Sequence, residues 1–197
     1  MRFGPILNRA FYERPSVDVA RDLLGKNRRP RRDGRHDRGD RGPIRAATTW
    51  RRTRRAESRR GPALSSGPPG HAYVYFIYGM YQCLNLVCEP DGTAGCVLVR
   101  ALEPVAGIPI MQGRRPSARK LEDLASGPGK LTLALAITLQ HNGADVTRGS
   151  LTVREPSEKR RFEIAITPRI ESASASTPPL RFLVAGNKSV SKSRSFT

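Results

Sequence analysis

Residues 27–66 form an arginine-rich stretch that limits the possible folds of this chain more than any other feature. The stretch holds fourteen Arg and four acidic residues, and its only large apolar side chains are Ile44, Trp50 and Leu64. Because this composition buries too little apolar surface to offset the chain entropy lost on folding, we expect the stretch to be disordered. The hydrophobic core must come from the segments on either side.

The flanking segments carry the patterns of a mixed α+β fold. Residues 16–24 read as a short amphipathic helix, with Ser16 as its N-cap and Gly25 as its end. A second helix is predicted over 129–140, and a turn at 90–92. Strands are predicted at 72–78, 82–88, 95–102, 150–154, 161–167 and 180–185. We therefore predict a single α+β domain over 1–197 with mostly antiparallel strands, interrupted at 27–66 and ending in a frayed tail over 187–197.

Several classes of protein are disfavoured by the composition. No run of about 18 apolar residues is present, so no transmembrane helix is expected. The first residues lack the apolar segment of a secretory signal. Three cysteines without a C-x-x-C pair or a His/Cys cluster indicate neither a disulfide scaffold nor a zinc site. We expect a cytoplasmic protein that does not interact with membranes.

The net charge favours a polyanionic partner. Thirty-five Lys and Arg against seventeen Asp and Glu give +18, and basic residues near phosphates release condensed counterions. The arginine-rich stretch alone carries +10 of this charge. The charge is therefore also compatible with a basic segment that has no specific role.

Four of the five tyrosines lie between residues 73 and 81, namely Tyr73, Tyr75, Tyr78 and Tyr81. On a strand Tyr73 and Tyr75 share a face, and a bend at Gly79-Met80 could project Tyr78 or Tyr81 outward. Clustered aromatic rings can stack on an unpaired base or wedge between base pairs. They can equally pack in a core with their hydroxyl groups hydrogen-bonded.

Three further polar residues have two interpretations each. Asn85, within an apolar strand, either bonds the backbone or reads the edge of a ligand. Arg100 either pairs with Glu103 or contacts a phosphate or substrate. Residues 126–130 precede the second predicted helix, where free N–H groups and Lys130 would suit a phosphate.

Taken together, these segments resemble the alkyladenine, or 3-methyladenine, DNA glycosylase family. The resemblance rests on GPPGHAYVYFIYGMYQCLNLVCE (67–89), VLVRALEPVAG (97–107), ASGPGKLTLAL (125–135) and PLRFLVAGN (179–187). FYERPSVDVARDLLGK (11–26) resembles the N-terminal segment of the family. The matching segments occur in the order of the family, and the Tyr-Gly-Met block is specific to it.

The resemblance implies an enzyme of base-excision repair that flips alkylated purines out of double-stranded DNA and hydrolyses their N-glycosidic bond. It implies no metal and no cofactor, and we expect a monomer. Tyr78 would be the intercalating wedge and Tyr75 would stack on the extruded base. Asn85 would line the pocket, Arg100 would help to hold the active site together, and Lys130 would lie on the phosphate side.

One part of the family pattern is missing. The family carries its catalytic glutamate in a Glu-Ala-Tyr motif and a pocket histidine in a Ser-His-Ala motif, and neither occurs in residues 27–66. The catalytic residue of this chain is therefore unknown. One hypothesis is a shifted reading frame, because rereading the codons of 43–61 with free wobble positions admits Ala-Ser-His-Ala. Resequencing the gene tests it, and an intact stated frame would remove it.

Two functions follow from the sequence. The first is a 3-methyladenine DNA glycosylase. The alternative is a catalytically impaired, DNA-binding relative that lacks the catalytic glutamate and uses the arginine-rich stretch as an electrostatic arm.

Overall fold

The main sheet of the protein has six strands, and every neighbouring pair is antiparallel. The computed structural model describes residues 4–30, 44–51, 67–90, 93–156, 161–168 and 179–190. The strands follow the order β3 (Ala72–Ile77), β4 (Tyr81–Val87), β5 (Cys96–Pro104), β2 (Ile44–Arg51), β8 (Arg181–Val184) and β7 (Ile164–Thr167). A second, two-stranded sheet pairs β1 (Asn27–Pro30) with β6 (Leu151–Arg154). The predicted α+β class with antiparallel strands is confirmed.

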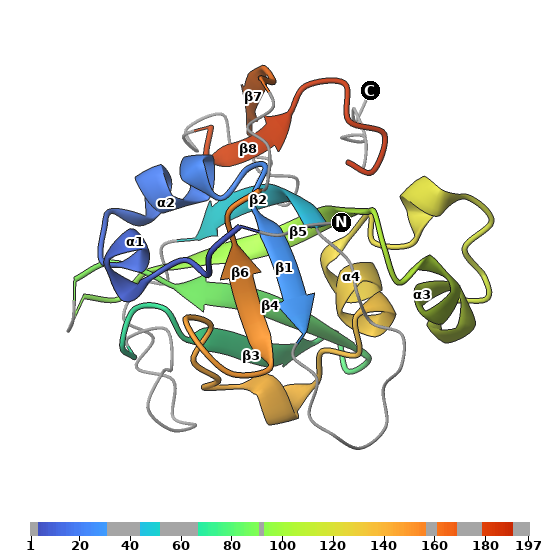
Figure 1. The fold of residues 1–197 in the computed structure, drawn as a ribbon, viewed down its shortest axis with the longest axis horizontal. Coiled ribbons are helices and arrows are strands. Elements are labelled where there is room, and N and C mark those ends of the chain that lie inside the picture. The colour runs from blue at the N-terminus through green and yellow to red at the C-terminus, as the bar shows by residue number, and fades with distance from the viewer. Residues whose placement is uncertain are drawn as a thin grey trace.

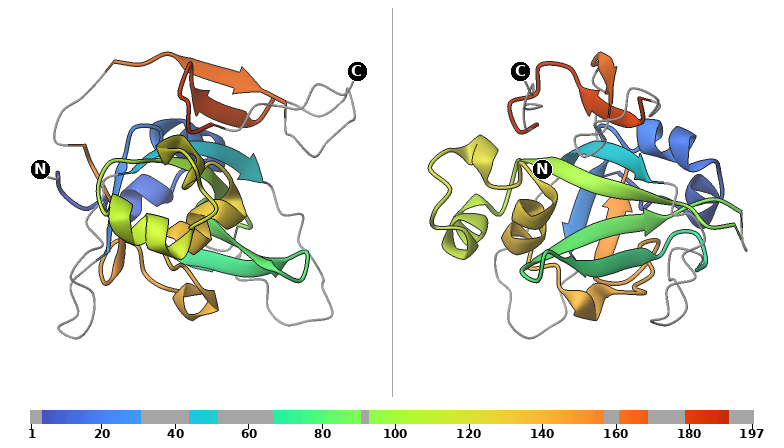
Figure 2. Two further views of the ribbon diagram at one scale, coloured as in Figure 1. Left: turned by 90° about the vertical axis from the view of Figure 1, so that its right-hand side faces the viewer. Right: turned by 180° about the vertical axis from the view of Figure 1, so that it is seen from behind.

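Short helices lie at the two ends of the main sheet (Figures 1 and 2). One end carries α1 (Arg9–Tyr12) and α2 (Ser16–Asp22), and the other carries α3 (Ile108–Arg114) and α4 (Pro128–Ala134). Single 3₁₀ turns occur at Leu121–Asp123 and Leu139–His141. None of the described helices has the length and hydrophobicity that crossing a bilayer requires.

The alternation of side chains along β3, β4 and β5 separates the sheet into two different faces. Val74, Leu84 and Val97 are buried on one face, in a hydrophobic cluster with residues of α2, α4 and β6. Tyr75 and Cys83 pair across β3 and β4 on the other face. Because successive residues of a strand point to opposite sides, the hydrophobic cluster takes one face and Tyr75 lies on the other, beside the buried Cys83.

The arginine-rich stretch contains two strands, which corrects the expectation of disorder for those segments. Backbone of β1 pairs with β6, and backbone of β2 pairs with β5 and β8. A ladder of main-chain hydrogen bonds needs no apolar side chain, and Ile44, Thr48 and Trp50 are residue types enriched in strands. Residues 31–43 and 52–66 lie outside the described residues, as do Asp91 and Gly92 of the predicted turn.

The N-terminus of α2 is also built differently from the prediction. Pro15 is the N-cap, and Ser16 is the first helical residue. The backbone N–H and hydroxyl of Ser16 both donate to Glu89 Oε1, at 2.8 and 2.5 Å. A distant carboxylate therefore supplies the acceptor that a local cap would otherwise provide.

Helix α4 ends at Ala134, shorter than the predicted helix over 129–140. The backbone N–H of Ile137 donates to Thr132 O at 2.8 Å, and that of Ala136 donates to Leu133 O at 3.1 Å. This pair of bonds is a Schellman motif, in which the residue after the C-cap adopts a left-handed conformation. Ala136 occupies this position with φ +49°, where glycine is the usual residue.

Replacing Ala136 with Gly should stabilise the protein. A left-handed residue with a Cβ costs about 1–2 kcal/mol, which glycine avoids. Glycine loses more conformational entropy on folding, which offsets about 0.5–1 kcal/mol of this gain. The net gain in the free energy of unfolding is therefore about 0.5–1 kcal/mol, measurable by urea denaturation. The matched change Ala134→Gly, at a fully buried helical position, should lower stability. A loss of stability in Ala136→Gly would contradict the strain at this position.

The first residues of the predicted frayed tail are ordered, which corrects that expectation for 187–190. Asn187 Nδ2 donates to Glu103 Oε2 at 2.9 Å, and its Oδ1 accepts from the backbone N–H of Ser189 at 2.9 Å. Ser189 is buried. These bonds hold the chain after β8 against β5, whereas residues 191–197 lie outside the described residues.

Candidate functional site

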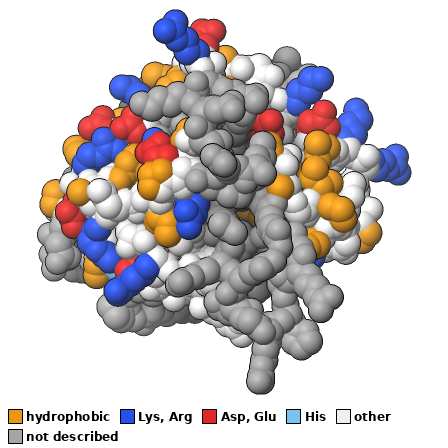
Figure 3. Space-filling model, viewed as in Figure 1, with side chains coloured by type: hydrophobic (Ala, Val, Ile, Leu, Met, Phe, Trp, Pro, Cys, Tyr) orange, Lys and Arg blue, Asp and Glu red, His pale blue; other side chains and the backbone are white. Residues whose placement is uncertain are grey.

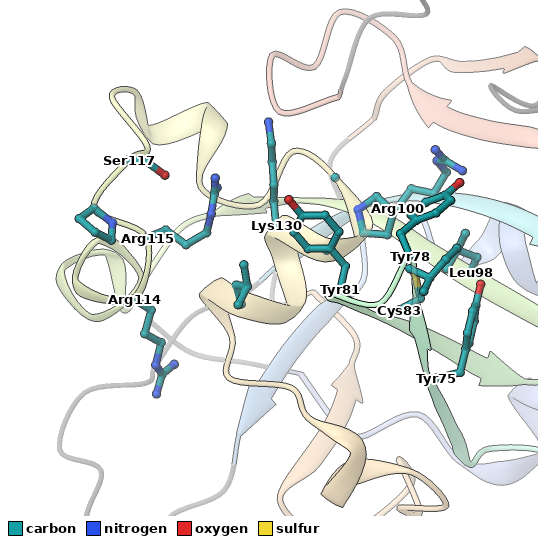
Figure 4. Close-up of a pocket in the computed structure, with 16 residues that line it drawn as sticks. Tyr75, Tyr78, Tyr81, Cys83, Leu98, Arg100, Arg114, Arg115, Ser117 and Lys130 are labelled. Carbon is teal, nitrogen blue, oxygen red and sulfur yellow. The ribbon is translucent and has the colours of Figure 1, made fainter.

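A cavity of about 530 Å³ opens where the β3–β4 hairpin meets α3 and α4. Figure 4 shows Tyr75, Cys83 and Leu98 at one side, Arg114, Arg115 and Ser117 at the other, and Tyr81 and Lys130 between them. Its described lining residues are Tyr75, Ile77, Tyr78, Tyr81, Cys83, Leu98, Arg100, Arg114, Arg115, Pro116, Ser117, Gly127, Pro128, Gly129, Lys130 and Leu133. Aromatic rings and positive charges thus share one hollow.

The aromatic side of the cavity is preorganised by stacking. The rings of Tyr73 and Tyr75 lie 5.3 Å apart between centroids with an interplanar angle of 24°. Tyr75 lines the cavity, whereas Tyr73 does not. Because Tyr73 supports one face of the Tyr75 ring, less side-chain entropy is lost when a flat ligand stacks on Tyr75.

The β3–β4 turn holds Tyr78 in an unusual backbone conformation. Tyr78 has φ +54°, Gly79 has φ +67°, and the Met80 N–H donates to Ile77 O at 3.3 Å. Two successive positive φ angles are typical of a type I′ turn, which favours Asn and Gly and strains an aromatic residue. Tyr78 is 74% exposed. The hairpin therefore presents a large apolar side chain to solvent at the mouth of the cavity.

Arg100 lies at an irregularity of β5. Val99 pairs with Thr48 and Ala101 pairs with Ala47, so that Arg100 has no register partner on β2. Such bulges redirect a side chain, and Arg100 reaches the cavity. Burial lowers the pKa of Arg181 on β8, and the nearby charge of Arg100 lowers this pKa further. The two guanidinium groups therefore lie close enough for the charge of one to affect the other.

The side of the cavity nearest α3 is basic as well. Arg114 Nη1 donates to Ala134 O at the end of α4, at 3.2 Å, and Lys130 Nζ donates to Ser126 Oγ at 3.1 Å. These two acceptors are a backbone carbonyl and a hydroxyl group, and both are neutral. By contrast, acidic and basic side chains are interspersed over α1 and α2 on the face shown in Figure 3. Among the described residues that line the cavity, four are basic and none is acidic.

The described lining residues include no Asp, Glu or His. Within the described part of the chain, no three His, Cys, Asp or Glu side chains form a group that could hold a metal. The described wall can therefore stack on a ring and bind an anion, but it supplies no carboxylate for proton transfer.

Four of the five predicted site residues lie together at the cavity, namely Tyr75, Tyr78, Arg100 and Lys130. Asn85 is fully buried beside it; its Nδ2 donates to Tyr73 O at 3.1 Å, and its Oδ1 lies 3.8 Å from Cys96 Sγ. The Asn85 amide was predicted either to bond the backbone or to read the edge of a ligand, and the structure shows the bond to the backbone. The functional roles of all five residues stay predictions.

The predicted site residues include neither Arg114 nor Arg115, and Tyr81 was identified from the sequence only as a member of the tyrosine cluster. The Tyr81 ring lies so close to Gly129 that a Cβ on this glycine would come within 2.9 Å of the ring. The run RRPSARK (114–120) is the one signal that could have identified the arginines. No local pattern indicated that this run lies close to the β3–β4 hairpin in the folded protein.

The whole sequence was compared with known protein families and with named proteins. The sequence model of a family described as methylpurine-DNA glycosylase matches residues 45–188. A protein of Methanocella arvoryzae, named provisionally as a 3-methyladenine DNA glycosylase, is 45% identical over 84% of this chain and 84% of its own length. A relative of the same name from Methanoculleus marisnigri is 43% identical over 93% of this chain and 97% of its own. A third, from Bradyrhizobium diazoefficiens, is 39% identical over 97% and 93%.

The family predicted from the sequence is thereby confirmed. The matched region contains every described residue that lines the cavity, and the relatives align along most of their lengths. The chain belongs to the methylpurine-DNA glycosylase family.

Proposed function

We propose that this protein is a DNA glycosylase of base-excision repair, which removes alkylated purines from double-stranded DNA by hydrolysing the N-glycosidic bond. It acts as a monomer in the compartment that holds the DNA, the cytoplasm or the bacterial nucleoid. The observation that carries this proposal is the exposed Tyr78, held at a strained turn at the mouth of an aromatic and basic cavity.

Tyr78 is suited to fill the space that a flipped nucleotide leaves. A base inside a duplex cannot be attacked, and extruding it costs a few kcal/mol of stacking and pairing. An apolar wedge that enters the stack offsets part of this cost. The turn presents the Tyr78 ring to solvent before DNA binds, so the wedge needs no rearrangement.

The cavity is suited to receive the extruded base. Alkylation of a ring nitrogen makes a purine cationic, which strengthens its stacking on the tyrosine face and improves it as a leaving group. Tyr75, supported by Tyr73, offers such a face. Arg100 and Lys130 also line the cavity. In this proposal Arg100 helps to hold the active site together, and Lys130 contacts a backbone phosphate.

Hydrolysis also requires a base that activates water for attack on the sugar carbon, and glycosyl hydrolysis normally uses a carboxylate. The described cavity wall has none. Asp33, Asp37, Asp40 and Glu57 of the arginine-rich stretch lie outside the described residues, as does His36. This observation favours a second candidate, a binder of damaged DNA that does not cleave it.

A base-release assay separates the two functions. The purified full chain is incubated with a duplex that contains methylated adenine, and the free base and the protein–DNA complex are both measured. Release supports the glycosylase, whereas a complex without release supports the binder. Neither release nor complex formation would contradict both.

Replacing Tyr75 with Ala should weaken binding to a lesion duplex by about 10–100-fold, because stacking on an aromatic ring contributes about 1–3 kcal/mol per base. Tyr75→Phe keeps the ring and should bind within about threefold of the wild type. Fluorescence anisotropy measures both, and the test applies whether or not the chain is catalytic. Equal losses in the two variants would assign the effect to the hydroxyl group instead of stacking.

A further inference from the structure

A short chain of hydrogen bonds leads from Arg115, at the end of α3, to Lys130 on α4. Arg115 Nη1 donates to the backbone oxygens of Asp123 and Leu124, the latter at 2.7 Å. Ser126 Oγ donates to the same Asp123 oxygen at 3.4 Å and accepts from Lys130 Nζ at 3.1 Å. The Asp123 carbonyl therefore joins the guanidinium group to the hydroxyl that holds the Lys130 ammonium group.

The segment between these two residues is firmly held. Leu124 and Ala125 are each 1% exposed, and the Leu102 N–H of β5 donates to Ala125 O at 3.0 Å. Ser126 is 8% exposed. Because its neighbours are anchored in the core and on the sheet, the Ser126 hydroxyl is a fixed point for the flexible Lys130 side chain.

Both cations keep their charge available to the cavity. Arg115 and Lys130 line it, and in the described part of the chain neither of them forms an ion pair. Each instead donates to neutral oxygens. A lysine ammonium group has three donors, and the bond to Ser126 uses one. Figure 4 shows Arg115 and Lys130 on the same side of Tyr81, with Tyr81 between Lys130 and Arg100.

We infer that Arg115 is a positioning residue for DNA binding. Through the Asp123 carbonyl and the Ser126 hydroxyl, it holds the Lys130 ammonium group where a backbone phosphate beside the flipped nucleotide enters the cavity. This inference rests on the proposed DNA substrate. It assigns the phosphate contact to Lys130 and an indirect role to Arg115, although both residues are cationic and both reach the same cavity.

The test is a set of substitutions measured on undamaged duplex DNA over a range of salt concentrations. Lys130→Gln should lower the slope of log affinity against log salt by about 0.9, the value for one phosphate contact. Ser126→Ala removes no charge, yet it should weaken binding by about three- to tenfold, the effect of one lost hydrogen bond. Arg115→Gln should reproduce the loss of Ser126→Ala or exceed it slightly.

The double variant gives the decisive comparison. If Arg115 acts through Lys130, the variant with both Arg115→Gln and Lys130→Gln should bind about as weakly as Lys130→Gln alone. Additive losses, with a slope reduced by about 1.8, would show that Arg115 contacts a phosphate itself and would overturn the inference. Wild-type binding by Ser126→Ala would also overturn it. Ser126→Ala keeps the test valid if Arg115→Gln fails to fold.

Arg119→Gln is the matched control for charge. Arg119 is exposed and lies four residues from Arg115, so this change removes the same formal charge from the same region. It should weaken binding less than Arg115→Gln does. Equal effects would reduce the role of Arg115 to its charge and contradict the inference.

Failure of this inference can be told from failure of the proposed function. Base release by the wild type together with unaltered binding by Ser126→Ala would leave the glycosylase in place and remove the positioning role. If the variants bind as predicted but the wild type releases no base, the positioning role would stand and the glycosylase function would be contradicted. A wild-type chain that does not bind DNA would contradict both.

Discussion

Replacing Tyr78 with Asn is expected to stabilise the protein and at the same time to weaken its binding to damaged DNA. Asn tolerates the left-handed conformation that Tyr78 adopts at φ +54°. Relief of the strain should raise the free energy of unfolding by about 1 kcal/mol. Loss of the wedge should lower affinity for a lesion duplex by about 10–100-fold, from about 1–3 kcal/mol of lost stacking. Thermal unfolding and fluorescence anisotropy measure the two effects.

A single-stranded lesion oligonucleotide is the control for this prediction, because a wedge matters only inside a base stack. Its affinity should change little. Tyr78→Phe keeps both the ring and the strain, so neither stability nor binding should change much. Equal losses on single and double strands would contradict the wedge.

Replacing Phe182 with Ala is expected to cost about 3–5 kcal/mol of stability, the range for removing a buried aromatic side chain. Phe182 on β8 is 2% exposed and belongs to the hydrophobic cluster. A loss of this size is a large part of the total stability of a small protein. Urea denaturation measures it.

Phe76 on β3 provides the matched control, because it is a strand phenylalanine that is 50% exposed. Phe76→Ala should cost about 1 kcal/mol or less, the span of strand propensities. Similar losses in the two variants would mean that the C-terminal hairpin does not pack on the core as described.

Local patterns predicted the part of the fold in which neighbouring residues decide the structure. The strands at β3, β4 and β5 were predicted from runs of apolar and aromatic residues, and they occur within two residues of the predicted bounds. The end of α4 was not predicted correctly. Ala136 adopts a left-handed conformation there, and the next residue, Ile137, is buried in the core at 2% exposure. A tertiary contact outweighs helix propensity there.

The candidate site shows the same division. The tyrosines of the hairpin and Lys130 were identified because they lie in compact motifs. Tyr81 against Gly129 and Arg115 against Asp123 were missed. These contacts form only after folding brings the hairpin, α3 and α4 together, and no local periodicity encodes such proximity.

The β7–β8 hairpin joins the rest of the main sheet through β2, a strand that lies within the most polar fifth of the sequence. Main-chain ladders depend little on which side chains a strand carries. Many side-chain substitutions in β2 would therefore leave intact the main-chain hydrogen bonds that attach the β7–β8 hairpin to the sheet.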